Sequence, residues 1–414
     1  MIPPNASPTV LPRSPAGSSA PLSAGLTAVF AAACGLSVAN IYYAQPLIAL
    51  IAPALGLHAG LAGLVVALTQ LGYGAGLLLL VPLADEVENR RLVLWLFGGV
   101  VLGLLGVGVA TSAAGFLAAT FVVGVCAAAT QILVPFASQL APDASRGRVV
   151  GNVMGGLLAG VMLARPFASA VAAAFGWRAV FFVTAALMLA LIVVLAKALP
   201  PRHPGGERTP YRRIVASMPR LYLRTPLLRR RAFYQGMMFA AFNVFWTGSP
   251  LLLAQAFGFG QPAIAVFALA GAAGALSAPL AGRLADRGLT RPATGAALAA
   301  AVLAFVLAGW AGHAHSLAWL VLAALLLDAA VQVCQVLSLR SIYMLAPELR
   351  GRFNGLFMTS VFVCGAGGSV LAAAVYTAFG WTGLAVLGAL CGLAALALYA
   401  TEFRRLPAAA AEAA

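Results

Sequence analysis

The sequence predicts an all-α membrane protein with 12 transmembrane helices in two pseudo-symmetric six-helix bundles. Three observations support this fold class: the composition, the number of apolar runs and an internal repeat. The chain has 414 residues, of which 62% are hydrophobic and 8% are charged, whereas a soluble domain is about 45–50% apolar and about 25% charged. This composition excludes a soluble enzyme, a disordered protein and a secreted disulfide scaffold. All five cysteines lie inside apolar segments, so we expect no disulfides.

Apolar runs between polar segments define the elements. A membrane-spanning helix takes about 20 residues, and the apolar part of the chain has room for about twelve of them. The predicted spans are 24–53, 59–83, 91–111, 114–140, 149–174, 178–199, 232–257, 262–281, 292–311, 317–338, 353–378 and 381–402. The predicted domains are a disordered head (1–22), a first bundle (23–199), a basic linker (200–231), a second bundle (232–403) and a tail (404–414).

The basic residues predict the orientation of these spans. The net charge is +15, and 23 of the 25 Lys and Arg residues lie in the head, the tail and one alternate set of loops. An excess of Lys and Arg marks cytoplasmic loops, so both termini and the linker 200–231 are predicted to be cytoplasmic. The linker's charges would also suit anionic lipid. Because the charges follow the topology and form no patch, we expect no nucleic-acid partner.

An internal repeat relates the two halves. Four landmarks recur at offsets of 201–205 residues, and six spans separate the copies. The matched segments are 40–43 with 243–246, 83–85 with 284–286, 141–148 with 346–352, and 174–177 with 378–381. The halves therefore have the same orientation in the membrane. Parallel repeats of this kind occur in transporters that hold a solute between the halves near the middle of the membrane.

The loop after the second span of each half resembles the major facilitator superfamily, whose pattern there is G-x-L-A-D-R-x-G-R-R. Residues 282–288 fit this pattern, whereas residues 81–91 carry Val81, Glu86 and Glu88 at positions of glycine or a basic residue. The resemblance implies that these loops form a latch at the cytoplasmic seam; the alternative is simple helix capping. The candidate gating residues are Asp85, Arg90, Arg91, Asp286 and Arg287.

A second resemblance is to drug/proton antiporters and bacterial sugar and nucleoside efflux permeases. Residues 39–47, Ala-Asn-Ile-Tyr-Tyr-Ala-Gln-Pro-Leu, resemble the first helix of that group. Gly151 and Gly160 keep the glycine spacing of its fifth helix, and Arg165 stands where that group has proline. The resemblance implies a multi-pass transporter of the bacterial inner membrane, and we expect a monomer.

Polar residues recur on single faces of four spans. Asp328, Gln332 and Gln335 are spaced i, i+4 and i+7, which places them on one side of a helix. The resemblance places spans one, four, seven and ten around a central cavity. The alternative is that these groups only hydrogen-bond neighbouring helices. The candidate cavity residues are Asn40, Tyr43, Gln131, Gln139, Asn243, Trp246, Gln332 and Gln335.

Two full charges are predicted to lie deep in the membrane, at a cost of roughly 2.5–3.5 kcal/mol each. Asp328 is the only carboxyl group within a predicted span away from its ends, so it is the candidate proton-coupling residue. Arg165 is its candidate partner. For both residues the alternative is a purely structural pairing.

The sequence lacks the motifs of enzymes. There is no G-x4-G-K-[ST] loop and no His-Glu-x-x-His motif, so we expect no ATP hydrolysis, no cofactor and no metal site. We expect a secondary active transporter that exports a small organic solute by alternating access, in exchange for protons. The alternatives are a proton-coupled importer of a small metabolite and a membrane sensor or scaffold that does not transport. The expected partners are the solute, protons and membrane lipid.

Overall fold

The computed structural model describes residues 23–202, 210–346 and 349–402. The predicted disorder of 1–22 and the predicted tail 404–414 lie outside these residues. In the first half the helices are α1 (Ala24–Ala39), η1 (Gln45–Leu47), α2 (Ile48–Ala54), η2 (Ala59–Leu61), α3 (Leu64–Leu79), η3 (Val81–Asp85), α4 (Asn89–Val109), α5 (Ala113–Ala127), α6 (Thr130–Leu140), α7 (Asp143–Phe175) and α8 (Trp177–Ala198).

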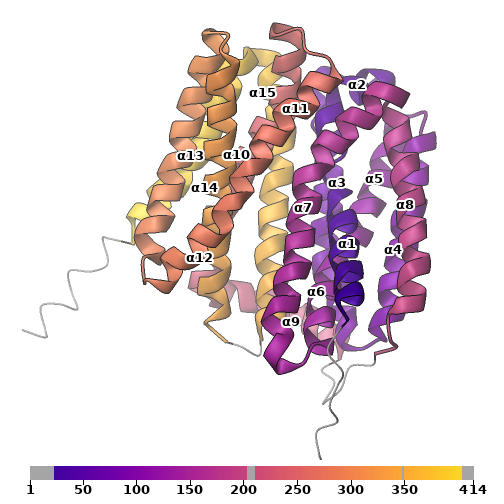
Figure 1. Cartoon of the computed structure of the whole chain (residues 1–414). Helices are drawn as coiled ribbons and strands as arrows, with labels where there is room; N and C mark the ends of the chain where they lie inside the picture. Colours follow the sequence, from indigo (N-terminus) through magenta and orange to yellow (C-terminus); the bar gives the residue numbers. More distant parts are fainter. Residues whose placement is uncertain (1–22, 203–209, 347–348, 403–414) are drawn as a thin grey trace, which may run out of the picture.

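The second half follows the same plan, and Figure 1 shows the two halves side by side. Its helices are α10 (Pro226–Ala256), α11 (Gln261–Ala272), η4 (Ala273–Ser277), α12 (Ala278–Asp286), α13 (Thr290–His313), α14 (Leu317–Tyr343) and α15 (Arg350–Ala400). Nine helical segments of the described residues are long and apolar enough to cross a membrane. The first and eighth spans are divided into shorter helices, and α15 contains the last two spans. The predicted all-α fold with twelve spans in two bundles is confirmed.

The break in the first span has a local cause. α1 ends at Ala39, where the Asn40 side chain donates hydrogen bonds to the carbonyls of Leu36 (2.8 Å) and Ser37 (3.2 Å). These bonds satisfy carbonyls that the helix end leaves without a partner. The chain then turns through residues 40–44 and resumes at η1, with Pro46 in its first turn. The continuous helix predicted for 24–53 is therefore divided in two.

The repeated Ala-Phe-Gly-Trp segments join the last two spans of each half. The glycine has positive φ in both copies, 82° at Gly176 and 63° at Gly380, a conformation that other residues rarely adopt. The following tryptophan begins the next span in each half. Trp177 packs against Phe116 at 6.0 Å between ring centroids. Trp381 donates a 2.8 Å hydrogen bond to the carbonyl of Ala308. In both halves the repeat thus keeps a sharp turn at the glycine and a packed tryptophan directly after it.

The linker contains a helix that the sequence pattern did not predict, α9 (Tyr211–Arg224). Its apolar residues Ile214 and Met218 are buried, one turn apart on the same face. Tyr211 attaches it to the first bundle, because its amide donates to the Glu86 carboxylate and its hydroxyl donates to the carbonyl of Leu79. α9 therefore lies against the end of the second span. α10 starts at Pro226, before the predicted boundary at 232.

Small residues allow α1 and α7 to pack closely. A Cβ added at Gly156 would lie 2.4 Å from the carbonyl oxygen of Ala31, and one added at Gly160 would lie 2.2 Å from that of Gly35. Both distances are shorter than any real Cβ contact, so only glycine fits. Small residues four apart are typical of helix contacts in membranes.

This contact predicts the effect of one substitution. Gly156→Val is expected to force α1 and α7 apart and to destabilise the first bundle by about 1–3 kcal/mol, the usual cost of overpacking. The measurement is the thermal unfolding midpoint of the purified protein in detergent. Gly155→Val is the control, because a Cβ at Gly155 meets nothing within 4 Å. Equal midpoints for the two variants would contradict the prediction.

Candidate functional site

A buried carboxylate lies in the second bundle. Asp328 on α14 is 9% exposed, and its Oδ1 accepts a 2.9 Å hydrogen bond from the indole Nε1 of Trp246 on α10. The eighth span passes close behind it, because a Cβ at Gly274 would lie 2.5 Å from the Cβ of Asp328. Glycine at this position therefore allows the backbone of η4 to cover the acid. The carboxylate is held between η4 and the tryptophan.

A buried guanidinium from the first bundle meets the same tryptophan. Arg165 on α7 is 3% exposed, and its Nε donates a 2.9 Å hydrogen bond to Oε1 of Gln45. Its guanidinium carbon lies 4.5 Å from the ring centroid of Trp246, 4.9 Å from that of Phe242 and 5.3 Å from that of Tyr42. Such contacts are worth about 2 kcal/mol or more when desolvated. Three aromatic rings thus surround the cation.

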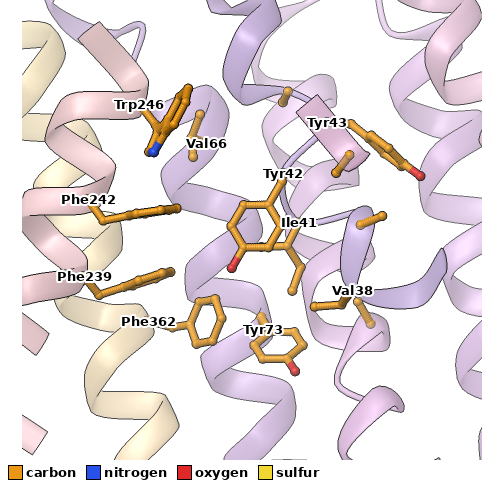
Figure 2. Close-up of a cluster of buried hydrophobic side chains, with 14 of the residues drawn as sticks. Val38, Ile41, Tyr42, Tyr43, Val66, Tyr73, Phe239, Phe242, Trp246 and Phe362 are labelled. Carbon is orange, nitrogen blue, oxygen red and sulfur yellow. The ribbon is translucent and has the colours of Figure 1, made fainter. Parts of the chain in front are cut away.

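Trp246 connects the two charges. Its N–H binds Asp328 while its ring contacts Arg165, and the two charges interact electrostatically without forming a direct ion pair. Arg165 belongs to the first bundle, whereas Asp328 and Trp246 belong to the second. Figure 2 shows Trp246, Phe242 and Phe239 in a column on one helix, with the ring of Tyr42 directed toward them. The predicted pair is therefore brought together across the bundle interface, through an indole.

An amide network crosses the interface beside these charges. Oδ1 of Asn243 accepts hydrogen bonds from Gln70 (2.5 Å), Gln45 (3.3 Å) and Ser369 (3.4 Å). Gln45 and Gln70 come from the first bundle, and Asn243 and Ser369 come from the second. Since Gln45 also binds Arg165, the network and the charge cluster are continuous. All four of these side chains are buried.

The interface is closed on both sides of this cluster. At the end near α2, a Cβ at Gly63 would lie 2.0 Å from the carbonyl oxygen of Ser369, so α3 and α15 are in close contact. Toward the end near α9, Gln131 accepts a 3.2 Å hydrogen bond from Asn354. Thr359 donates to the carbonyl of Gly74 at 3.1 Å. The cluster is therefore enclosed in this conformation.

The other predicted cavity residues form no hydrogen bond to either charge within the described part of the chain. Asn40 donates its side-chain hydrogen bonds to carbonyls at the end of α1. Tyr43 is buried against Phe167 at 5.7 Å between ring centroids, and Figure 2 shows it directed away from Tyr42. Gln139 is exposed, and Gln332 and Gln335 are half-buried. Gln131 binds Tyr73 and Asn354. The assignment of a cavity role to these residues stays a prediction.

The two predicted gating loops differ in their contacts. Asp286 forms a 2.5 Å ion pair with Arg340 at the end of α14, within the second bundle. Arg287 is exposed at the C-terminus of α12. Asp85 interacts electrostatically with Arg352 at the start of α15, in the opposite bundle. The remaining two gating candidates bind within the first bundle, Arg90 to the carbonyl of Ala196 and Arg91 to Glu88 at 3.2 Å.

Among the residues of this site that the sequence pattern did not single out are Tyr42, Gln45, Gln70 and Ser369. Tyr42 and Gln45 lie in the motif at 39–47. Gln45 could have been predicted as a site residue, because a buried glutamine before a proline needs a hydrogen-bond partner. Gln70 and Ser369 lie on the second and eleventh spans, which were not predicted to line a cavity. Polar character alone does not separate them from other buried polar residues of helix contacts.

The chain matches the profile of the Major Facilitator Superfamily over residues 26–368. It is 39% identical over 389 residues to a protein of Escherichia coli O157:H7 named "Uncharacterized transporter YgaY", with 94% of this chain and 98% of that one covered. It is 34% identical over 380 residues to the "Probable transporter SCO4007" of Streptomyces coelicolor, with 91% and 87% covered.

Solved structures share the fold at low sequence identity. The nucleoside transporter NupG (D323A mutant) is 13% identical with a TM-score of 0.72, and 91% of this chain and 100% of that one are covered. The human organic anion transporter MFSD10 (TETRAN) is 19% identical with a TM-score of 0.65, and 90% and 98% are covered. The chain therefore belongs to the major facilitator superfamily and is a multi-pass membrane transporter, not an enzyme.

Proposed function

We propose that this transporter exports a small organic solute in exchange for protons, by alternating access between its two bundles. One observation carries the proposal. A buried carboxyl group, Asp328, is connected to a buried cation of the opposite bundle, Arg165, through Trp246. A proton that binds at this position changes the interaction between the bundles, which is what a coupling site must do.

The coupling follows from electrostatics. Ionised Asp328 attracts Arg165 across the interface and accepts the N–H of Trp246. A proton removes this charge and weakens both interactions, so it favours conformations in which the bundles separate at the cluster. A ligand shifts a conformational equilibrium by its differential affinity for the two states. Asp328 can thus bind a proton on one side of the membrane and release it on the other.

A second candidate is a proton-coupled importer, in which the solute and the proton move together. Arg165 favours it, because its guanidinium retains a full positive charge after Asp328 is protonated, and arginine does not deprotonate in proteins. A negatively charged solute could then balance that charge. The direction of movement under physiological gradients separates the two candidates.

Cells and vesicles together test the proposed function. Deletion and overexpression strains are expected to differ in the level of at least one small organic solute. Proteoliposomes that contain the purified protein are then expected to move that solute against its gradient when a pH gradient is imposed. Equal solute levels in the two strains, or vesicle flux no greater than in protein-free vesicles, would contradict the proposal.

We also propose a bacterial inner-membrane location with both termini and α9 on the cytoplasmic side, because most Lys and Arg residues lie on that set of loops. A reporter enzyme that is active only in the periplasm is expected to stay inactive when fused near Arg213. The same reporter fused after Leu57, in the first predicted outer loop, is the positive control. Activity at Arg213 would overturn the orientation.

A further inference from the structure

The guanidinium of Arg165 retains hydrogen-bonding capacity that the protein does not use. Its Nε donates to Gln45, but its Nη2 is fully buried and has no hydrogen-bond partner. Two buried hydroxyl groups share this property, Ser169 one turn along α7 and Ser249 on α10. Buried polar atoms are nearly always paired, and a buried group without a partner costs about 1–3 kcal/mol or more. Three such atoms, two on α7 and one on α10, indicate a site that accepts a ligand.

The geometry of the cluster indicates which chemical group of a ligand fits this site. Arg165, Trp246 and Ser249 line a cavity of about 10 Å³, whose wall is completed by apolar residues such as Ile264 and Phe267. This volume suits about one water molecule, so an organic ligand needs the bundles to separate. The aromatic rings contact the guanidinium, while its N–H groups donate in the plane of the group. A planar guanidinium matches the two oxygens of a carboxylate.

The charges around the cluster determine which ligand charge the site accepts. Within the described part of the chain, the charged and titratable side chains that act on Arg165 are Asp328 and Tyr42. Ionised Asp328 balances the charge of the arginine, and a protonated Asp328 leaves it unbalanced. A monoanion restores neutrality in the second case. Because binding couplings are reciprocal, a proton on Asp328 and an anion on Arg165 each favour the binding of the other.

We propose that Arg165, assisted by Ser249, binds the carboxylate group of the transported solute, and that the proton on Asp328 binds together with this anion. The inference rests on the second candidate of the proposed function, in which proton and solute move together, and it names the substrate class of that candidate: small organic monocarboxylates. A single guanidinium with one counter-charge suits one negative charge, so a dianionic phosphate would leave the buried site with excess charge.

Equilibrium binding to the full chain in lipid nanodiscs tests the proposal, with benzoate and its neutral amide, benzamide, as a matched pair of probes. Benzoate is expected to bind more tightly at mildly acidic pH than at neutral pH, whereas benzamide binds weakly at both. Arg165→Gln is expected to weaken benzoate binding roughly tenfold or more, the scale of a lost charge-assisted hydrogen bond. Asp328→Asn, which mimics the protonated acid, is expected to bind benzoate at neutral pH as tightly as the unmodified protein does at acidic pH.

The opposite effects of these two variants separate a binding role from a structural one. Equal binding of benzoate and benzamide, or unchanged benzoate binding in Arg165→Gln, overturns the proposal. If Arg165→Gln does not fold, Ser249→Ala replaces it, with benzoate binding expected to weaken severalfold; an unchanged value again overturns the proposal. Benzoate binding without proton-driven flux of any solute would refute the transport function and leave the anion site standing.

Discussion

Asp328→Asn is expected to abolish transport that is driven by a pH gradient, while solute exchange in the absence of a gradient persists. Asparagine has nearly the same volume as aspartate and keeps an oxygen that can accept the 2.9 Å hydrogen bond from Trp246. It cannot bind and release a proton. The cluster therefore keeps its packing and loses its coupling. The measurements are the final accumulation ratio and the counterflow rate in proteoliposomes.

The control is the same chemical change at an acid outside the cluster. Asp286 forms an exposed ion pair with Arg340, and exposed pairs are worth about 0–1 kcal/mol. If it belongs to the predicted latch, Asp286→Asn slows the approach to the final accumulation ratio without changing that ratio. Concentrative transport by Asp328→Asn would show that the coupling ion, or the direction of transport, has been misread.

Gly63→Ala is expected to block transport by preventing the bundles from closing at the end near α2. The added Cβ would lie 2.0 Å from the carbonyl oxygen of Ser369 and 2.9 Å from the Cα of Val370. Both atoms belong to the backbone of α15, so a rotation of a side chain cannot relieve the contact. Overpacking of about 1–3 kcal/mol shifts a conformational equilibrium by roughly 5- to 150-fold.

Thiol labelling measures this shift directly. Val370→Cys, in a protein whose native cysteines are replaced, is expected to react faster with a membrane-impermeant maleimide when Gly63→Ala is also present. Gly60→Ala is the matched control, because its Cβ would meet its nearest neighbour at an ordinary 3.7 Å. Equal labelling and equal transport in the two variants would show that the α3–α15 contact does not control access.

The sequence alone was sufficient to predict the fold and to identify the two charged residues inside the membrane. Twelve apolar runs and the matched halves predict the two-bundle architecture, because a helix in lipid must satisfy its backbone hydrogen bonds within itself. Asp328 and Arg165 stand out among the residues of the predicted spans, because a full charge is costly inside the membrane. The glycine in each Ala-Phe-Gly-Trp segment is also visible as a repeat, since the sharp turn at Gly176 and Gly380 requires that residue.

Only the tertiary structure shows that Trp246 joins the two charges, and that Tyr42, rather than Tyr43, faces them. Helical periodicity states which residues share a face of one helix, but it carries no information on how that helix is rotated against another helix far along the chain. In the first span even the periodicity fails, because the helix stops at Ala39 and the chain turns before η1. The orientations of Tyr42 and Gln45 are therefore decided by packing against α7 and α10, and this packing completes the site.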